Sequence, residues 1–271
     1  MSEDHLDKYK KSSFAPAFLL LGKKKKKALC AVYAFARLAD DIADDETLQP
    51  AEKEKLLYLL RKELSDCFSG KFRKPLFTDI YEASASFYLK EETFTRIIDG
   101  VSMDIKPFSY RSYNELERYM NGVAAAPGLL TLQICGYTGP AEELSIKLGH
   151  AVQLTNIIRD IYSDARAGRF YIPQEDLDKF SVSRESLSSG EKNEKTISLL
   201  EFEAFRAEKL YSLSDEIISA SGGSSLLVTM IIKNLYFSLL KKIRAENFDI
   251  INKIPEISRY EKLKAVFNAL F

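Results

Sequence analysis

Two stretches of the sequence place aspartates at helical spacing. Asp40 and Asp44 are four residues apart, and so are Asp160 and Asp164. At 100° per residue, each pair projects from one face of a helix. Like charges at this spacing destabilise a helix by about 0.2–0.5 kcal/mol, so two such pairs suggest that something neutralises them. Mg²⁺ prefers a few carboxylates together with water and phosphate oxygens. Four carboxylates on two facing helices would suit a cluster of Mg²⁺ ions that holds a diphosphate.

Polar side chains accompany each aspartate pair. Tyr33 and Arg37 fall within about 60° of Asp40 on a helical projection, and Gln153 and Asn156 lie as near to Asp160. Two solvated helix faces explain this pattern as well as a lined cavity does, because acidic helix faces are common. The amides and the tyrosine favour the cavity. Two further acidic residues, Asp45 and Glu46, are expected on the outer side of their helix, away from any ligand.

The elements that carry these residues are predicted to be helices. Apolar residues recur with helical period almost throughout, and the chain has 12 Gly and 8 Pro among 271 residues. We expect an all-α fold with a single domain spanning residues 1–271. The predicted helices cover approximately residues 28–45, 52–67, 78–89, 91–104, 112–135, 141–166, 196–220, 224–247 and 257–270.

Two interruptions of the helical pattern bear on function. Gly168 to Gly190 is the longest stretch without helical period, which is typical of a functional loop. Gly168 stands where a C-terminal cap glycine belongs. Pro127 falls inside the predicted helix 112–135 and is expected to kink it.

Charge and cysteine content exclude several classes of protein. The 39 basic and 39 acidic residues cancel, whereas a nucleic-acid binder usually shows a basic excess. No pair among the three cysteines has the spacing of a zinc or redox site, so we expect reduced thiols. Two histidines cannot build a multi-histidine metal site. No glycine-rich dinucleotide fingerprint is present.

Membrane contact is expected to be peripheral at most. The N-terminal residues lack the apolar core of a secretory signal, and the most apolar stretch, 226–240, is too short to span a bilayer. We therefore expect a cytoplasmic protein. The five consecutive lysines Lys23–Lys27 are either a solvated helix start, or a basic rim that attracts diphosphate or the anionic inner face of the membrane.

Several motifs resemble those of a known family. YAFARLADDIADD (33–45), DGVSMDI (99–105) and QLTNIIRDIYSDARAGRFYIP (153–173) are similar to signatures of the squalene/phytoene synthases, which are head-to-head (trans) isoprenyl diphosphate synthases. SSF (12–14) resembles the start of the family's substrate flap, and the region of Tyr236 resembles its penultimate helix. The overall look of the motifs is that of bacterial squalene-pathway members.

The resemblance implies an isoprenoid synthase-like fold of helices packed around a central cavity. It implies two or three Mg²⁺ ions on Asp40, Asp44, Asp160 and Asp164. Catalytic roles beside these aspartates fall to Tyr33, Arg37 and Tyr119, of which the tyrosines would lie close to the reacting carbons. Substrate-binding residues implied in the same way are Ser13, Phe14, Arg37, Gln153, Asn156, Arg159, Arg169, Tyr171 and Tyr236.

The implied reaction condenses two prenyl diphosphates, with farnesyl diphosphate expected, through a cyclopropylcarbinyl diphosphate to a C30 isoprenoid. A phytoene synthase that uses geranylgeranyl diphosphate and a non-catalytic scaffold protein remain alternatives. A head-to-tail prenyltransferase or terpene cyclase fits the second motif poorly. NADPH as a reductant stays open, although no motif indicates a site for it.

Four features depart from the family pattern or need a separate assignment. Asn121 occupies a position where many relatives carry an aromatic or basic residue, and the run from Ala124 to Gly128 differs in part from the usual small-residue motif. These departures affect the expected product more than the expected activity. Asp104 is expected to support the site without ligating metal, and His150 is expected to be a packing or surface residue.

Overall fold

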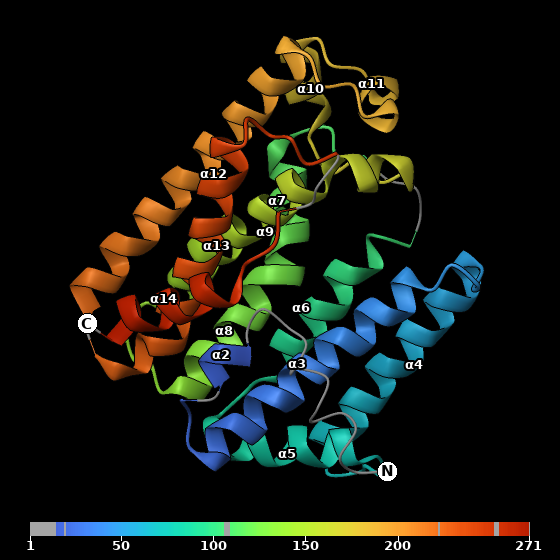
Figure 1. Cartoon of the computed structure of the whole chain (residues 1–271). Coiled ribbons are helices and arrows are strands. Elements are labelled where there is room, and N and C mark those ends of the chain that lie inside the picture. The colour runs from blue at the N-terminus through green and yellow to red at the C-terminus, as the bar shows by residue number, and fades with distance from the viewer. Residues whose placement is uncertain (1–14, 19, 106–108, 222, 252–254, 271) are drawn as a thin grey trace.

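The computed structural model describes residues 15–18, 20–105, 109–221, 223–251 and 255–270, which form helices and no β-strand (Figure 1). The all-α prediction is therefore confirmed. The helices are α2 (Ala15–Phe18), α3 (Lys23–Asp44), α4 (Pro50–Phe68), α5 (Pro75–Phe87), α6 (Glu91–Ser102), α7 (Tyr113–Met120), the π-helical turn η2 (Asn121–Ala125), α8 (Ala126–Cys135), α9 (Ala141–Arg166), α10 (Gln174–Phe180), α11 (Arg184–Ser189), α12 (Glu194–Ser221), the 3₁₀ turn η3 (Ser224–Leu226), α13 (Leu227–Ala245) and α14 (Arg259–Leu270).

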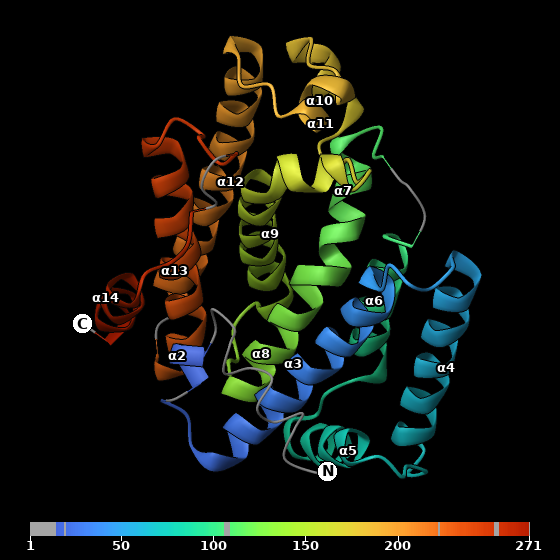
Figure 2. The same ribbon diagram turned by 45° about the vertical axis from the view of Figure 1, so that its right-hand side comes forward.

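Two long helices organise the packing. Helix α3 contacts α4, α5, α6 and α8, whereas α9 contacts α8, α11, α12 and α13. In Figure 2, α3 to α5 lie on one side of the molecule and α12 to α14 on the other, with α8 and α9 between them. Of the two helices that carry the aspartate pairs, α3 therefore lies on one side of the bundle and α9 in its middle.

Helix α3 begins at Lys23, so the lysine run is helical instead of preceding the helix. The Lys25 ammonium donates to the carbonyl of Cys135 at the end of α8 (2.7 Å), and Lys27 pairs with Asp79 and Glu82 of α5 (2.9 and 2.8 Å). At 1.5 Å per residue, Lys25 lies about 22 Å along the helix from Asp40. Lys25 and Lys27 thus link the start of α3 to α8 and α5, at the end of the helix far from Asp40. This position favours a structural role of these two lysines over a basic rim around a diphosphate.

The helix predicted over 112–135 is divided by η2, which ends two residues before Pro127. A π-helical turn locally widens the backbone, which relieves the loss of a proline N–H and its steric clash. Glycines fit η2 between its neighbours: a Cβ on Gly122 would lie 2.6 Å from the carbonyl oxygen of Arg96 on α6. On the other side, a Cβ on Gly149 of α9 would lie 2.8 Å from the Ala125 nitrogen. A π-helical turn thus stands next to Pro127, where a kink was expected.

The segment after α9 is more ordered than its lack of period suggested. Gly168 has φ +76°, and the N–H groups of Gly168 and Arg169 donate to Ala165 and Asp164 at 3.0 and 2.8 Å, as a Schellman cap requires. The expected cap is confirmed. The expectation of one long loop up to Gly190 is wrong, because α10 and α11 form there. Each has only six or seven residues, too few for a period to emerge.

The described helices bury one large apolar cluster, to which α3, α6, α9, α12 and α13 all contribute. Across the described ranges, none of the helices is both long and apolar enough to cross a membrane.

Candidate functional site

A polar chamber of about 320 Å³ lies between α3 and α9. Asp40 and Asp44 reach it from the last turns of α3, and Asp160 and Asp164 from the last turns of α9. Asp104 reaches it from the turn after α6. The chamber therefore gathers five carboxyl groups from three parts of the chain.

Burial and neighbouring charges raise the pKa of three of these carboxyl groups. Burial, followed by the neighbouring charge of Asp44, raises the pKa of Asp40 to about 7. Burial also raises the pKa of Asp104 and of Asp164 to about 6. Desolvation and like charges both disfavour the ionised carboxylate, and here they act together. The chamber thus concentrates acidic groups, and added cations would stabilise their ionised form.

Arginines offset part of this charge. The Arg169 guanidinium bridges the two aspartate pairs, since it reaches Asp44 at 3.1 Å and Asp164 at 3.0 Å. Arg159 donates two hydrogen bonds to Asp160, at 2.8 and 2.5 Å. A bridging guanidinium of this kind links α3 to the loop after α9 and places a cationic donor at the centre of the chamber.

A tyrosine cluster forms one wall of the chamber. The Tyr171 hydroxyl donates to Asp104 at 2.9 Å, and its ring lies 5.1 Å from the ring of Tyr119. Backbone contacts with residues 109 and 110 hold the loop that carries Tyr171. Phe170 pairs with Ser109 in an isolated β-bridge, and the Gln174 N–H donates to the carbonyl of Tyr110 at 2.8 Å. These contacts hold Tyr171 over the acidic chamber.

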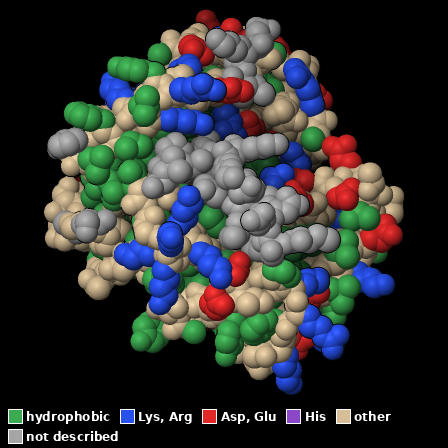
Figure 3. Space-filling model, turned by 60° about the horizontal axis from the view of Figure 1, so that its bottom comes forward, with side chains coloured by type: hydrophobic (Ala, Val, Ile, Leu, Met, Phe, Trp, Pro, Cys, Tyr) green, Lys and Arg blue, Asp and Glu red, His purple; other side chains and the backbone are tan. Residues whose placement is uncertain are grey.

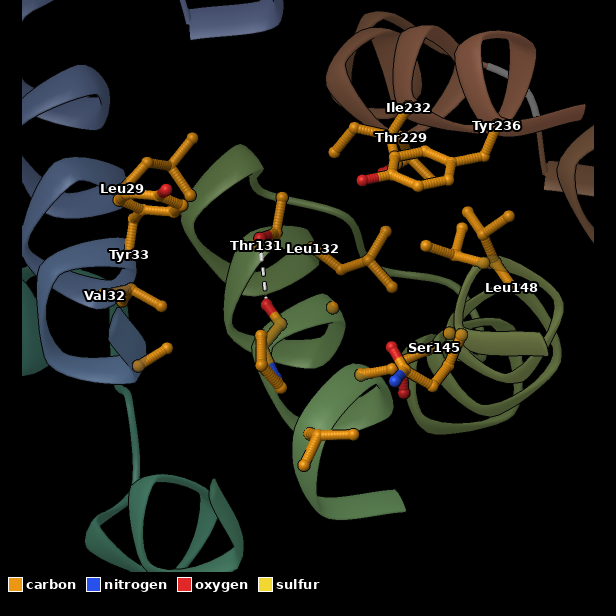
Figure 4. Close-up of a pocket in the computed structure, with 18 of the residues that line it drawn as sticks. Leu29, Val32, Tyr33, Thr131, Leu132, Ser145, Leu148, Thr229, Ile232 and Tyr236 are labelled. Atoms are coloured by element: carbon orange, nitrogen blue, oxygen red, sulfur yellow. Dashed lines mark hydrogen bonds between the residues drawn. The ribbon is translucent and has the colours of Figure 1, made fainter. Parts of the chain in front are cut away.

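An apolar chamber of about 340 Å³ adjoins the polar one. Figure 4 shows side chains of α3, α8, α9 and α13 pointing into it, among them Val32, Leu132, Leu148 and Ile232. The boundary between the chambers consists of residues that line both: Arg37, Asp40, Val123, Gln153 and Asn156. A ligand with a charged head and a hydrocarbon tail could therefore occupy both chambers at once.

The residues around the polar chamber fit Mg²⁺ in their chemistry. Carboxylates are its usual protein ligands, and the buried Asn156 Oδ1 has no hydrogen-bond donor within the described part of the chain. Within those ranges no three acidic, histidine or cysteine side chains already converge on one point. Asp44 and Asp164 are joined instead through Arg169. Holding an ion between the aspartate pairs would require Arg169 to release at least one of them.

The structure brings most of the predicted site residues together. Those lining the polar chamber are Arg37, Asp40, Asp44, Tyr119, Gln153, Asn156, Arg159, Asp160, Asp164, Arg169 and Tyr171. Tyr33 and Tyr236 line the apolar chamber. Ser13 and Phe14 lie outside the described residues.

Some residues that line the chambers were not predicted from the sequence, or were predicted only to support the site. Val123 lines both chambers, and Ser145 and Thr229 line the apolar one, although none has a side chain that marks it as a site residue. Asp104 was expected only to support the site, yet it lies in the polar chamber itself. His150 is buried, and its Nε2 lies 2.9 Å from Asn121 Oδ1, in agreement with a packing role.

The amino-acid sequence is similar to those of known prenyl synthases. Residues 8–261 match the sequence profile of the squalene/phytoene synthases. The chain is 33% identical over 244 residues to a presqualene diphosphate synthase of Zymomonas mobilis, covering 88% of this chain and 82% of that one. It is 29% identical over 253 residues to a phytoene synthase of Arthrospira platensis, with the same two coverages.

Solved structures share the architecture. A dehydrosqualene synthase crystallised with a ligand superposes with a TM-score of 0.87 at 28% identity, covering 99% of this chain and 95% of that one. The squalene synthase HpnC of Alicyclobacillus acidocaldarius, at 22% identity, has a TM-score of 0.83 and covers 91% of this chain and 93% of its own. The latter similarity concerns the fold alone.

Proposed function

The chain belongs to the squalene/phytoene synthase family, and from that premise we propose that it condenses two farnesyl diphosphates head to head into a C30 isoprenoid. The reaction passes through a cyclopropylcarbinyl diphosphate and releases diphosphate. Support comes from the relatives named presqualene diphosphate synthase, which reach 33% and 32% identity.

The observation that carries the proposal is the pair of adjoining chambers. The polar chamber suits a diphosphate, and the apolar chamber suits a prenyl chain. Asp40 and Asn156 stand at their boundary, which is where the bond between the diphosphate and the first prenyl carbon would lie.

The two aspartate pairs would hold Mg²⁺, and bound Mg²⁺ supplies charge stabilisation for the departing diphosphate. Arg159 and Arg169 orient the diphosphate through charge-assisted hydrogen bonds. Leu132, Leu148 and Ile232 exclude water from the carbocation that ionisation leaves. The face of the Tyr33 ring offers that cation about 0.5–2 kcal/mol of stabilisation.

The two alternatives to this function are a C40 product and a non-catalytic scaffold. A C40 product from geranylgeranyl diphosphate is supported by the phytoene synthases among the relatives, which reach 29% identity. A non-catalytic scaffold is disfavoured because all four aspartates are retained and line one chamber. Ala124, Pro127 and Gly128 line the apolar chamber, so this run bears on which product is made, whereas Asn121 lies against His150.

The test is product analysis by mass spectrometry. The purified protein is incubated with Mg²⁺ and farnesyl diphosphate, and separately with geranylgeranyl diphosphate, each with and without NADPH. A C30 product is expected, and its mass tells whether the intermediate is released, hydrated, deprotonated or reduced. A C40 product alone would make the protein a phytoene-type synthase, and no turnover by folded protein would favour the scaffold.

A further inference from the structure

Helix α14 carries four large apolar side chains that are exposed. Tyr260, Leu263, Phe267 and Leu270 are 73%, 71%, 61% and 51% exposed. Figure 3 shows hydrophobic side chains gathered on the left flank of the molecule, the flank on which α14 lies in Figure 1. Exposed apolar residues scattered singly are normal, but a contiguous set marks a contact surface.

These four residues, called the α14 stripe below, share one face of the helix. At 100° per residue they fall within an arc of about 80°. Arg259 and Lys264 project about 20° and 40° beyond its two edges, and no ion pair involves either of them among the described residues. The stripe is therefore apolar along its centre and cationic along both borders.

The single acidic residue of α14 is engaged at the helix start. The Ser258 N–H donates to the Glu261 carboxylate at 2.6 Å, and the Glu261 N–H donates to the Ser258 hydroxyl at 3.2 Å. This reciprocal capping box holds the carboxylate at the positive end of the helix dipole. Hydrogen bonding to Ser258 also lowers the pKa of Glu261, so this carboxylate is ionised at neutral pH, and its bond to Ser258 holds it at the helix start.

The face of α14 opposite the stripe packs against the protein, so the stripe points outward. Ala265 is buried, and its carbonyl accepts from the Asn234 amide of α13 at 3.4 Å. Helix α14 contacts both α13 and α2. The same α13 supplies Thr229, Ile232 and Tyr236 to the apolar chamber. The stripe thus lies one helix layer outside the wall of that chamber.

We propose that the α14 stripe docks on the surface of an anionic lipid bilayer. The apolar side chains enter the boundary between head groups and acyl chains, while Arg259 and Lys264 contact lipid phosphates, in the manner of an interfacial amphipathic helix. This inference goes beyond the proposed function, since it depends on the outer surface and not on turnover.

Two features favour a bilayer over other contacts. A stable contact with a second copy of the chain buries about 800 Å² per partner and engages about 20–30 residues a side, far more than four side chains on a helix about 18 Å long. The cationic borders would also repel their counterparts in a second copy. The lysine run suits a membrane less well, because Lys25 and Lys27 are engaged with Cys135, Asp79 and Glu82.

The experiment is sedimentation of the full chain with phosphatidylcholine vesicles that contain phosphatidylglycerol, compared with phosphatidylcholine alone. The test variants are Leu263→Glu with Phe267→Glu, and Arg259→Ala with Lys264→Ala. The matched control is Tyr58→Glu with Leu59→Glu, which alters an exposed apolar pair on α4, 66% and 43% exposed. Circular dichroism checks the fold, and light scattering after gel filtration reports the oligomeric state without lipid.

The wild type and the α4 control are expected to bind anionic vesicles alike. The stripe variant should bind at least 10-fold more weakly, and the arginine and lysine variant should lose the preference for anionic lipid. Absence of wild-type binding, or equal binding by the stripe variant, would overturn the proposal. A dimer that the stripe variant dissociates, without vesicle binding, would assign the stripe to a second copy instead.

Discussion

Neighbouring acidic residues of α3 differ in what surrounds them. Asp41 forms an ion pair with Arg37 at 2.8 Å, one helical turn away. Asp40, rotated by 100°, lines both chambers, and burial raises its pKa to about 7. One step along the helix therefore separates a surface charge pair from a candidate metal ligand.

The aspartate assignment predicts a loss of turnover without a loss of structure. Asp40→Asn or Asp160→Asn removes a charged oxygen ligand worth several kcal/mol, so turnover should fall at least about 1,000-fold. Helicity by circular dichroism should stay unchanged. The matched control is Glu46→Gln, since Glu46 is exposed just beyond α3. Wild-type-like rates in either aspartate variant would refute its role as a ligand.

The hydroxyl of Tyr171 offers a second prediction at this scale. Tyr171→Phe removes the hydrogen bond to Asp104, and a hydrogen bond to a charged group contributes about 1.5–3 kcal/mol. Turnover should therefore fall about 10- to 100-fold, while the affinity for the prenyl chain stays near that of the wild type.

Tyr162→Phe makes the same chemical change as a control. The buried Tyr162 hydroxyl has no hydrogen-bond partner among the described residues. Steady-state kinetics of the two variants should differ, and equal rates would show that the bond to Asp104 has no part in turnover.

At the scale of elements, the π turn η2 is held by close backbone approach. Gly122 meets α6, and Gly149 of α9 meets Ala125. Val123, between these contacts, lines both chambers. The π turn thus places Val123 at the boundary between the polar and the apolar chamber. Such turns are frequent at functional sites.

Gly122→Ala should destabilise the protein. The new Cβ would lie 2.6 Å from both the Arg96 carbonyl oxygen and the Gly100 Cα, and such overpacking costs about 1–3 kcal/mol. Gly128→Ala is the matched control, because its Cβ would meet Ser145 at an ordinary 3.6 Å. Helix propensity should leave that variant neutral or slightly stabilised. Urea unfolding compares the two, and equal stabilities would contradict the packing argument.

How well elements could be predicted depended on their length. The pattern over 141–166 has the bounds of α9, because 26 residues show the helical period many times. Helices α10 and α11 were missed for the opposite reason. The start of α3 was set too late, since five lysines carry no apolar period even though they are helical.

At the scale of the molecule, the two aspartate pairs lie on different helices, α3 and α9. Among the residues that the structure describes, Arg169 alone forms ion pairs with both, through Asp44 and Asp164. A ligand that binds both pairs would add further contacts between these two parts of the bundle.

Mg²⁺ and inorganic diphosphate together should therefore stabilise the folded protein more than either alone. Binding at 100 times the dissociation constant contributes about 2.7 kcal/mol, which for a chain of this length raises Tm by about 5–10 °C. Differential scanning fluorimetry measures the shift, which Asp40→Asn should reduce and chelation of the metal should abolish. An equal shift with diphosphate alone would argue against Mg²⁺ at the aspartates.

The sequence by itself determined the long helices, the polar faces of α3 and α9 and the family, because periodicity and motif spacing are local properties of the chain. The tertiary structure decided which of these faces meet. It placed Asp104 among the aspartates, set Arg169 between Asp44 and Asp164, and turned Lys25 toward α8. It also formed the apolar chamber from side chains such as Leu132 and Ile232, which are of the same types as the core. Whether such a residue fills the core or lines a cavity depends on how distant helices pack, and that information is spread over the whole chain.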